Sequence, residues 1–159
     1  MTVGNDMNFL TMGCWAQKHP DAGSLVTLFM GGNGIGGGMV INGRLWTGAS
    51  GYCSEVGFLP VYERLNKGSL GLPPAEHISE LYARLIQIYA VTVNPHMMVL
   101  YRHPLLEGRL DEIRRLCASY LPSKAIPSIE LSYDYQQDYE KGLFTVAKSM
   151  GQAVSEGGL

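Results

Sequence analysis

The sequence predicts an α/β domain whose sheet is partly parallel. In its second half, helix-like and strand-like segments alternate, from a helix over residues 74–94 to a closing helix over residues 136–150. Such alternation is typical of units in which a helix connects two parallel strands. A chain of 159 residues is long enough to bury a core but not to divide into several domains. We therefore expect one domain over residues 1–159.

The first half of the chain predicts a helix followed by a hairpin. Residues 8–18 carry apolar side chains in a loosely helical pattern, and residues 25–30 form a continuous apolar run, as in a strand buried on both faces. Six glycines then occur within residues 31–38. After them, residues 38–41 are expected to form a second strand, and Asn42-Gly43 favours a tight hairpin turn. The two strands would be antiparallel, with a glycine-rich corner between them.

The second half predicts a long loop and then alternating elements. Residues 47–74 show no clear periodicity and are interpreted as a functional loop. The elements expected after it are helices at 74–94, 105–121 and 136–150 and strands at 97–101 and 127–133. The first of these helices has an apolar stripe at helical spacing, and Asn94-Pro95 would end it.

Charge and composition exclude several classes of protein. The net charge of −2 does not favour nucleic acid or an anionic membrane as a partner. There is no run of about 18 apolar residues to span a membrane, and the N-terminus has no secretory pattern. The three cysteines form no CxxC or CxC pair, so we expect thiols in a reducing cytoplasm. Since clustered ligands are also missing, we expect no metal site.

The glycine-rich stretch permits two interpretations. Bare backbone lets several amide groups approach a ligand closely, and phosphate oxygens are their usual acceptors. A tight hairpin corner that needs positive φ angles is the structural alternative, and glycine count does not decide between the two. The stretch is neither a Walker loop nor a convincing dinucleotide fingerprint, because no Lys-Ser/Thr pair follows it and a hairpin takes the place of a helix.

Polar residues near the glycines favour a ligand. Asn5 and Asp6 come just before the first predicted helix, and Glu55 lies in the loop after the hairpin. One amide and two carboxylates beside a phosphate-type loop suit a polyhydroxylated ligand. One carboxylate could also act as base on a hydroxyl that attacks a phosphoryl group. Taken alone, Asp6 could simply be a residue that starts a helix.

Three stretches carry a resemblance to a known family. "NDMN", "GGNGIGGGMVINGRLWTGASG" and "EVGF" occur in the order and spacing of the ROK family, which groups sugar-responsive repressors and sugar kinases. "VNPHMMVLY" and "DYEKGLFTVAKS" resemble later segments of that family. The resemblance covers nearly the whole chain but only the C-terminal half of a typical member. It implies a ribonuclease H-like (actin-like ATPase) fold, of which this chain would be the C-terminal lobe, with the N-terminal lobe absent.

The resemblance also implies roles for individual residues. Asn5 and Asp6 match the sugar-binding pair, with Asp6 at the position of the catalytic base, and Glu55 matches the sugar-binding glutamate. The residues that match the second phosphate loop are Gly32, Asn33, Gly34 and Gly36. Because a sugar site in this fold lies between the lobes, half of it would come from elsewhere.

Departures from the family pattern bear on cofactors. Phe58 stands where members usually have a histidine, and the cysteine-rich segment that supplies zinc ligands is replaced. Tyr101-Arg102 stands in place of the Gly-Gly pair near the adenine. We therefore expect no zinc and no cofactor bound by this chain alone, while ATP and Mg²⁺ would belong to a complete parent protein.

Two functions follow as hypotheses. The first is a sugar-binding or regulatory ROK lobe that is not catalytic on its own, because a lone lobe cannot close over ATP and sugar. The alternative is a fragment of an ATP-dependent sugar (hexose) kinase. The expected partners are a small-molecule sugar and further copies of this chain, since an uncovered lobe face would favour association. No membrane and no nucleic acid is expected as a partner.

Overall fold

The computed structural model describes residues 3–32, 34–61 and 74–156, with side chains from residue 6 to residue 152 of these ranges. Its helices are α1 (Val3–Lys18), α3 (Ile78–Thr92), α4 (Leu110–Tyr120) and α5 (Tyr135–Glu156). Its strands are β1 (Ser24–Gly31), β2 (Gly34–Ile41), β3 (Arg44–Leu45), β4 (Met97–Tyr101) and β5 (Ser128–Ser132). None of the described helices is both long and apolar enough to cross a lipid bilayer.

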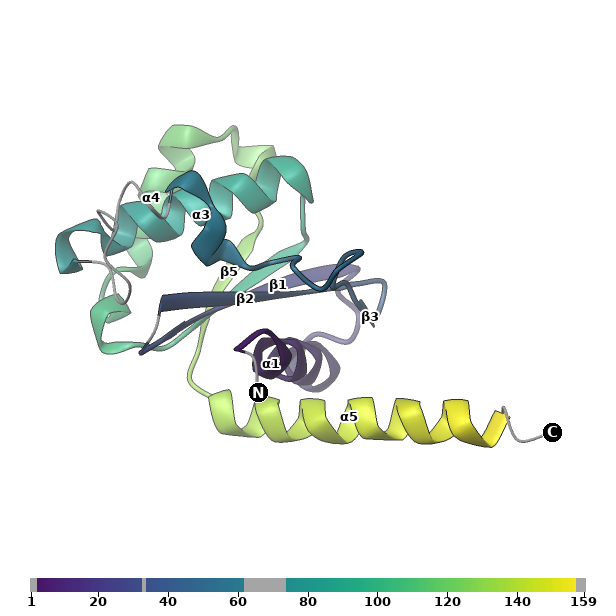
Figure 1. The fold of residues 1–159 in the computed structure, drawn as a ribbon. Coiled ribbons are helices and arrows are strands. Elements are labelled where there is room, and N and C mark those ends of the chain that lie inside the picture. Colours follow the sequence, from purple (N-terminus) through teal and green to yellow (C-terminus); the bar gives the residue numbers. More distant parts are fainter. Residues whose placement is uncertain (1–2, 33, 62–73, 157–159) are drawn as a thin grey trace.

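The five strands form one mixed sheet in the order β3-β2-β1-β4-β5. The hairpin strands β1 and β2 are antiparallel, whereas β1, β4 and β5 are parallel neighbours. Helices α3 and α4 cover one face of the sheet, and α1 and α5 lie on the other (Figure 1). The prediction of an α/β fold with a partly parallel sheet is therefore confirmed.

Strand β1 is buried on both faces, as its continuous apolar run predicts. The residues of β1 that join the core under α3 and α4 are Val26, Leu28 and Met30. On the opposite face Leu25 and Phe29 join the smaller core beside α1. Between them the Thr27 hydroxyl lies 2.6 Å from the Thr11 hydroxyl of α1. This buried hydrogen bond fixes the helix over the hairpin.

The glycine-rich corner lies between β1 and β2 as predicted but is shorter, because four of the six glycines lie within β2. This strand begins at Gly34, and Gly31 pairs with Gly34 across the turn. A Cβ atom on Gly38 would overlap the Thr11 hydroxyl and would lie 2.9 Å from the Met7 carbonyl oxygen. The bare strand therefore lets α1 approach the sheet closely, and helix packing rather than turn geometry explains this glycine.

Several element boundaries differ from the predicted ones. Helix α1 starts at Val3, so Asn5 and Asp6 lie in its first turn rather than before it. Helix α4 starts at Leu110 instead of residue 105, because Gly108 has a φ of 73° and interrupts the helical path. The hairpin turn is as predicted, with φ of 51° at Asn42 and 76° at Gly43.

A buried polar cluster joins α1, β4 and α5. The Lys18 ammonium lies 3.0 Å from carboxylate oxygens of Asp138 and Asp134 and donates to the Ser132 hydroxyl at 2.8 Å. The Tyr101 hydroxyl donates to the same Asp138 oxygen at 2.5 Å. Asp138 is completely buried, and these two donors replace water at its Oδ2 atom, while its Oδ1 atom has no hydrogen-bond partner among the described residues.

Raised pKa values in this region predict a loss of stability at high pH. Burial raises the pKa of the Cys14 thiol to about 12 and raises that of Tyr101. Burial lowers the pKa of Lys18, but its hydrogen bonds to Asp138 and Asp134 outweigh this, and the net pKa is raised. Each group keeps its proton in the folded protein at a pH where the unfolded chain has released it. The free energy of unfolding should therefore fall above about pH 9, where these groups start to titrate in the unfolded chain.

Urea titrations between pH 8 and pH 11 measure this effect. The midpoint is expected to fall steadily above pH 9, and Tyr101→Phe should flatten the fall because the substitution removes one titrating group. A midpoint that stays constant to pH 11 would contradict the assignment.

Candidate functional site

A cavity of about 370 Å³ opens beside the β1–β2 turn. It is lined by Phe29, Gly31, Gly32, Gly34, Ile35, Gly36, Glu55, Gly57 and Phe58. The structure thus brings Glu55 together with three of the four glycine-loop residues that the sequence singled out. The fourth, Asn33, lies outside the described residues.

The loop that carries Glu55 is anchored on the sheet. Val56, its neighbour, is buried, and the short 3-10 helix Val56–Phe58 follows directly. A Cβ atom on Gly37 of β2 would lie 3.0 Å from the Ser54 carbonyl oxygen and 3.1 Å from the Tyr89 hydroxyl. Glycine at this position therefore lets the loop pack directly on β2, which holds Glu55 at the cavity.

Asp6 is not among the described residues that line this cavity. Its carboxylate accepts a hydrogen bond of 3.3 Å from the Tyr139 hydroxyl of α5. The Tyr139 ring stacks on Tyr135 with centroids 6.1 Å apart, and Tyr135 packs at 4.7 Å on Phe29, which does line the cavity. A row of three aromatic rings thus connects Asp6 to the cavity. The side chain of Asn5 lies outside the described part of the chain.

The negative charge of Asp6 contributes to the raised pKa values of Tyr135 and Tyr139. Burial first and the Asp6 charge second raise the pKa of Tyr135 and of Tyr139. Both hydroxyls therefore keep their protons at neutral pH, and Tyr139 remains a hydrogen-bond donor to Asp6. The row of aromatic rings from Phe29 to Tyr139 could not be predicted from the sequence, because its members come from β1 and α5. The spacing of four residues between Tyr135 and Tyr139, which puts them on one helix face, was the available signal.

The sheet register limits which amides can meet a phosphate. The Trp46 amide donates a hydrogen bond to the Met39 carbonyl on one side of β2, and the Asn42 amide donates to the Gly23 carbonyl on the other side. The hydrogen-bonding groups of odd-numbered and even-numbered residues of β2 therefore face opposite neighbouring strands. The even-numbered residues, Gly34 and Gly36 among them, face β1. Their amides belong to the ladder, so they offer a ligand bare surface rather than free donors. A Cβ atom on Gly32 would meet nothing within 4 Å, which leaves its backbone open. The phosphate-binding role of this loop stays a prediction.

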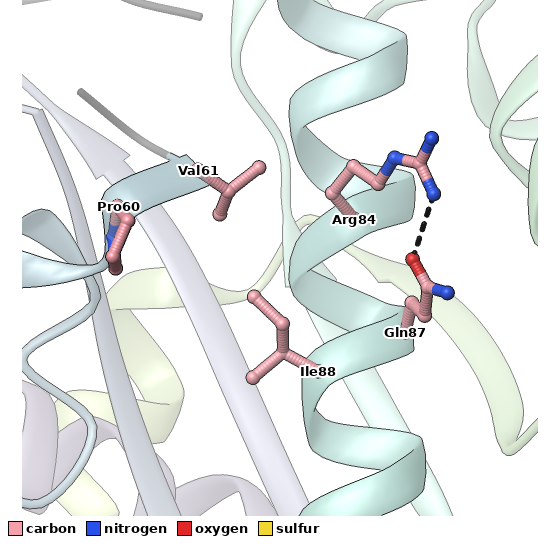
Figure 2. Close-up of a pocket in the computed structure, with 5 residues that line it drawn as sticks. All are labelled: Pro60, Val61, Arg84, Gln87 and Ile88. Carbon is pink, nitrogen blue, oxygen red and sulfur yellow. Dashed lines mark hydrogen bonds between the residues drawn. The ribbon is translucent and has the colours of Figure 1, made fainter. Parts of the chain in front are cut away.

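A second cavity of about 480 Å³ lies over α3 (Figure 2). Its described lining is Pro60, Val61, Arg84, Gln87 and Ile88, none of which lines the first cavity. Arg84 donates to the Gln87 side-chain oxygen at 2.9 Å and stacks 3.6 Å over the Tyr120 ring of α4. These contacts join α3 to α4, and the cavity contains none of the predicted site residues.

Tyr101 and Arg102, which stand in place of the Gly-Gly pair of the ROK pattern, lie in different environments. Tyr101 is buried, with its ring beside α5, whereas Arg102 is exposed and lies 5.7 Å from the Tyr133 ring. Only Arg102 could therefore meet a ligand. Among the described residues, no three His, Cys, Asp or Glu side chains gather closely enough to hold a metal ion.

Comparisons with known proteins agree with this architecture. The model of the ROK family matches residues 1–73. The ROK hexokinase of Thermus thermophilus superposes with a TM-score of 0.65 and 16% identity, over 91% of this chain and 65% of that one. A ROK family protein of Streptococcus pneumoniae TIGR4, solved in complex with sucrose, gives a TM-score of 0.66 and 15% identity, over 92% and 65%.

At these identities the superpositions establish the fold. It is that of ROK kinases, the ribonuclease H-like (actin-like ATPase) fold, and the predictions of this fold and of the ROK resemblance are confirmed. The chain covers about 65% of the length of the two structures. No curated protein matches the chain by sequence.

Proposed function

We propose that this chain, whose residues 1–73 match the model of the ROK family, is a sugar-binding lobe that does not transfer phosphate on its own. The observation that carries the proposal is the cavity beside the β1–β2 turn. Glu55 and the glycines of β2 line it together, and the aromatic row of Phe29, Tyr135 and Tyr139 connects it to Asp6. A volume of about 370 Å³ is within the range of small-molecule sites and suits a monosaccharide.

The two carboxylates have the chemistry that a sugar requires. Each can accept hydrogen bonds from neighbouring hydroxyl groups, and hydrogen bonds to a charged acceptor are the stronger kind. Asn5, Asp6 and Glu55 are the proposed sugar-binding residues. The sucrose bound to the Streptococcus pneumoniae relative supports a sugar as the ligand class.

A fragment of an ATP-dependent hexose kinase is the second candidate, and Asp6 favours it. A carboxylate in the first turn of α1 could remove the proton from an attacking sugar hydroxyl. The superposition on a hexokinase supports this candidate as well. Phosphoryl transfer, however, needs ATP and Mg²⁺ held against the sugar in a closed site. In that case a further lobe would supply the rest of the site, and ATP and Mg²⁺ would bind only to the complete protein.

Self-association belongs to the same proposal. Phe144 and Met150 are exposed on α5, which extends beyond the body of the domain (Figure 1). Exposed apolar side chains on a protruding helix favour contact with a second copy. A homo-oligomer and a cytoplasmic location both stay predictions.

Calorimetry with a panel of hexoses tests the sugar site. Glu55→Gln is expected to weaken hexose binding about tenfold, because it removes a charged acceptor. Asp6→Asn should leave binding largely intact but abolish any release of ADP in the presence of ATP and Mg²⁺. Glu107→Gln, which removes an exposed carboxylate far from the cavity lining, is the matched control and should bind like the unaltered chain.

Each outcome separates the candidates. Absence of binding heat for every hexose would reject the sugar site. Turnover at about 1 s⁻¹ or faster would reject the non-catalytic role and favour the kinase. Equal loss of binding and turnover in Asp6→Asn would make Asp6 a binding residue only.

A further inference from the structure

Two exposed aromatic side chains flank Glu55 in the loop after the hairpin. Phe58 is 75% exposed although it lines the cavity, and Tyr52 is 67% exposed. Their ring centroids lie 6.1 Å apart. A single exposed aromatic residue is ordinary, but two neighbouring exposed rings, one of which lines a cavity, mark a surface that a ligand can cover.

Two successive tight turns hold Tyr52, Glu55 and Phe58 close together. The Glu55 amide donates to the Tyr52 carbonyl at 3.2 Å, and the Phe58 amide donates to the Glu55 carbonyl at 3.1 Å. The first turn has a positive φ of 71° at Ser54, and the second is the short 3-10 helix Val56–Phe58. Glu55 lines one cavity together with Phe58 and a neighbouring cavity together with Tyr52.

We propose that Tyr52 and Phe58 form an aromatic platform for the apolar face of a hexopyranose whose hydroxyl groups are bound by Glu55. The proposal rests on the sugar-binding function above and names its substrate class as sugars in the ring form. The platform is defined as these two rings.

The chemistry of a pyranose explains the fit. Its hydroxyl groups lie around the rim of the ring, while axial C–H bonds form a flat apolar face. That face can pack on an aromatic ring and remove apolar surface of both partners from water. Glu55 shares the lining of a cavity with Phe58 and can accept hydrogen bonds from rim hydroxyls at the same time. An open-chain hexitol carries similar hydroxyl groups but presents no rigid face, so the platform selects against it.

Phe58 also stands where a polar side chain would be expected for a hydroxyl-rich ligand. It has no atom that donates or accepts a hydrogen bond. Its contribution must therefore come from apolar contact. Continuity of its ring with the cavity that Glu55 and Gly36 line favours a sugar over a second copy of the chain as the occupant.

Calorimetry on the full chain tests the platform, with D-glucose, D-mannose, D-galactose and N-acetyl-D-glucosamine as probes and sorbitol as the open-chain comparison. Phe58→Ala is expected to weaken binding of the preferred pyranose about tenfold and to reduce its preference over sorbitol. Phe58→Tyr keeps the ring and should stay within about twofold. Tyr133→Ala removes an aromatic ring that is 67% exposed and lies outside the cavity lining, and it should leave sugar binding unchanged.

Every result decides the proposal. A pyranose that binds equally well to Phe58→Ala overturns the platform but leaves the sugar site in place. An unaltered chain that binds none of the four sugars overturns the sugar site and the platform together. If Phe58→Ala keeps its sugar affinity but loses self-association in sedimentation experiments, the two rings serve a contact between copies instead.

Discussion

Replacing Gly142 with alanine is expected to destabilise the domain by about 3 kcal/mol, because helices α1 and α5 touch there through their backbones. A Cβ atom at this position would overlap the Phe9 carbonyl oxygen and would lie 3.1 Å from the Gly13 amide nitrogen. Neither neighbour is the end of a flexible side chain, so the helices must move apart. Urea denaturation of the variant and of the unaltered chain measures the difference.

Gly151→Ala is the control on the same helix. Nothing lies within 4 Å of a Cβ atom at that position. Because alanine is the better helix former, this change should raise stability by about 0.5–1 kcal/mol. A Gly142→Ala variant as stable as the control would show that the close crossing of the two helices is not required.

The boundaries of the strands and of α1 show which features a sequence pattern can predict and which it cannot. Strands β1 and β4 were predicted within one residue, since a continuous apolar run requires burial on both faces. The start of β2 at Gly34 was not predicted, because glycine has little strand propensity and the pairing of residues 34–37 with β1 forms only in the folded chain. The start of α1 at Val3 was missed because the apolar pattern that indicates this helix begins only at residue 8.

The same distinction holds for the candidate site. Glu55 and the glycines could be proposed from the sequence because they lie close together along the chain and resemble a family pattern. The tyrosines that reach Asp6 could not, since they lie on α5 and only the folded chain brings them together. The platform of Tyr52 and Phe58 depends on two successive tight turns, and so short a segment leaves no periodic signal in the sequence.

Asp138→Ala is expected to lower the free energy of unfolding by about 3 kcal/mol, which is the second large effect. The substitution leaves the Lys18 ammonium and the Tyr101 hydroxyl without the acceptor that they share. Lys18 is only 22% exposed and Tyr101 is buried, so water cannot fully replace the carboxylate. Removing one partner of a buried ion pair is costly for this reason.

Asp134→Ala provides a closely matched comparison. Its carboxylate also lies 3.0 Å from Lys18, but it is 49% exposed, so water screens the pair. The expected loss is below about 1 kcal/mol. Equal losses in the two variants, measured by urea denaturation, would show that burial does not decide the strength of these contacts.

The pairing of α1 with α5 has a consequence for the order in which the domain can form during synthesis. Lys18 and Asp138, which hold the two helices together, are 120 residues apart in the sequence. A nascent chain therefore completes the hairpin and the α3–α4 side of the sheet before the partner of its first helix has left the ribosome. Until then α1 covers the side of β1 that carries Leu25 and Phe29, without α5 beside it. Because such distant contacts form late, the last helix acts as the closing step of folding.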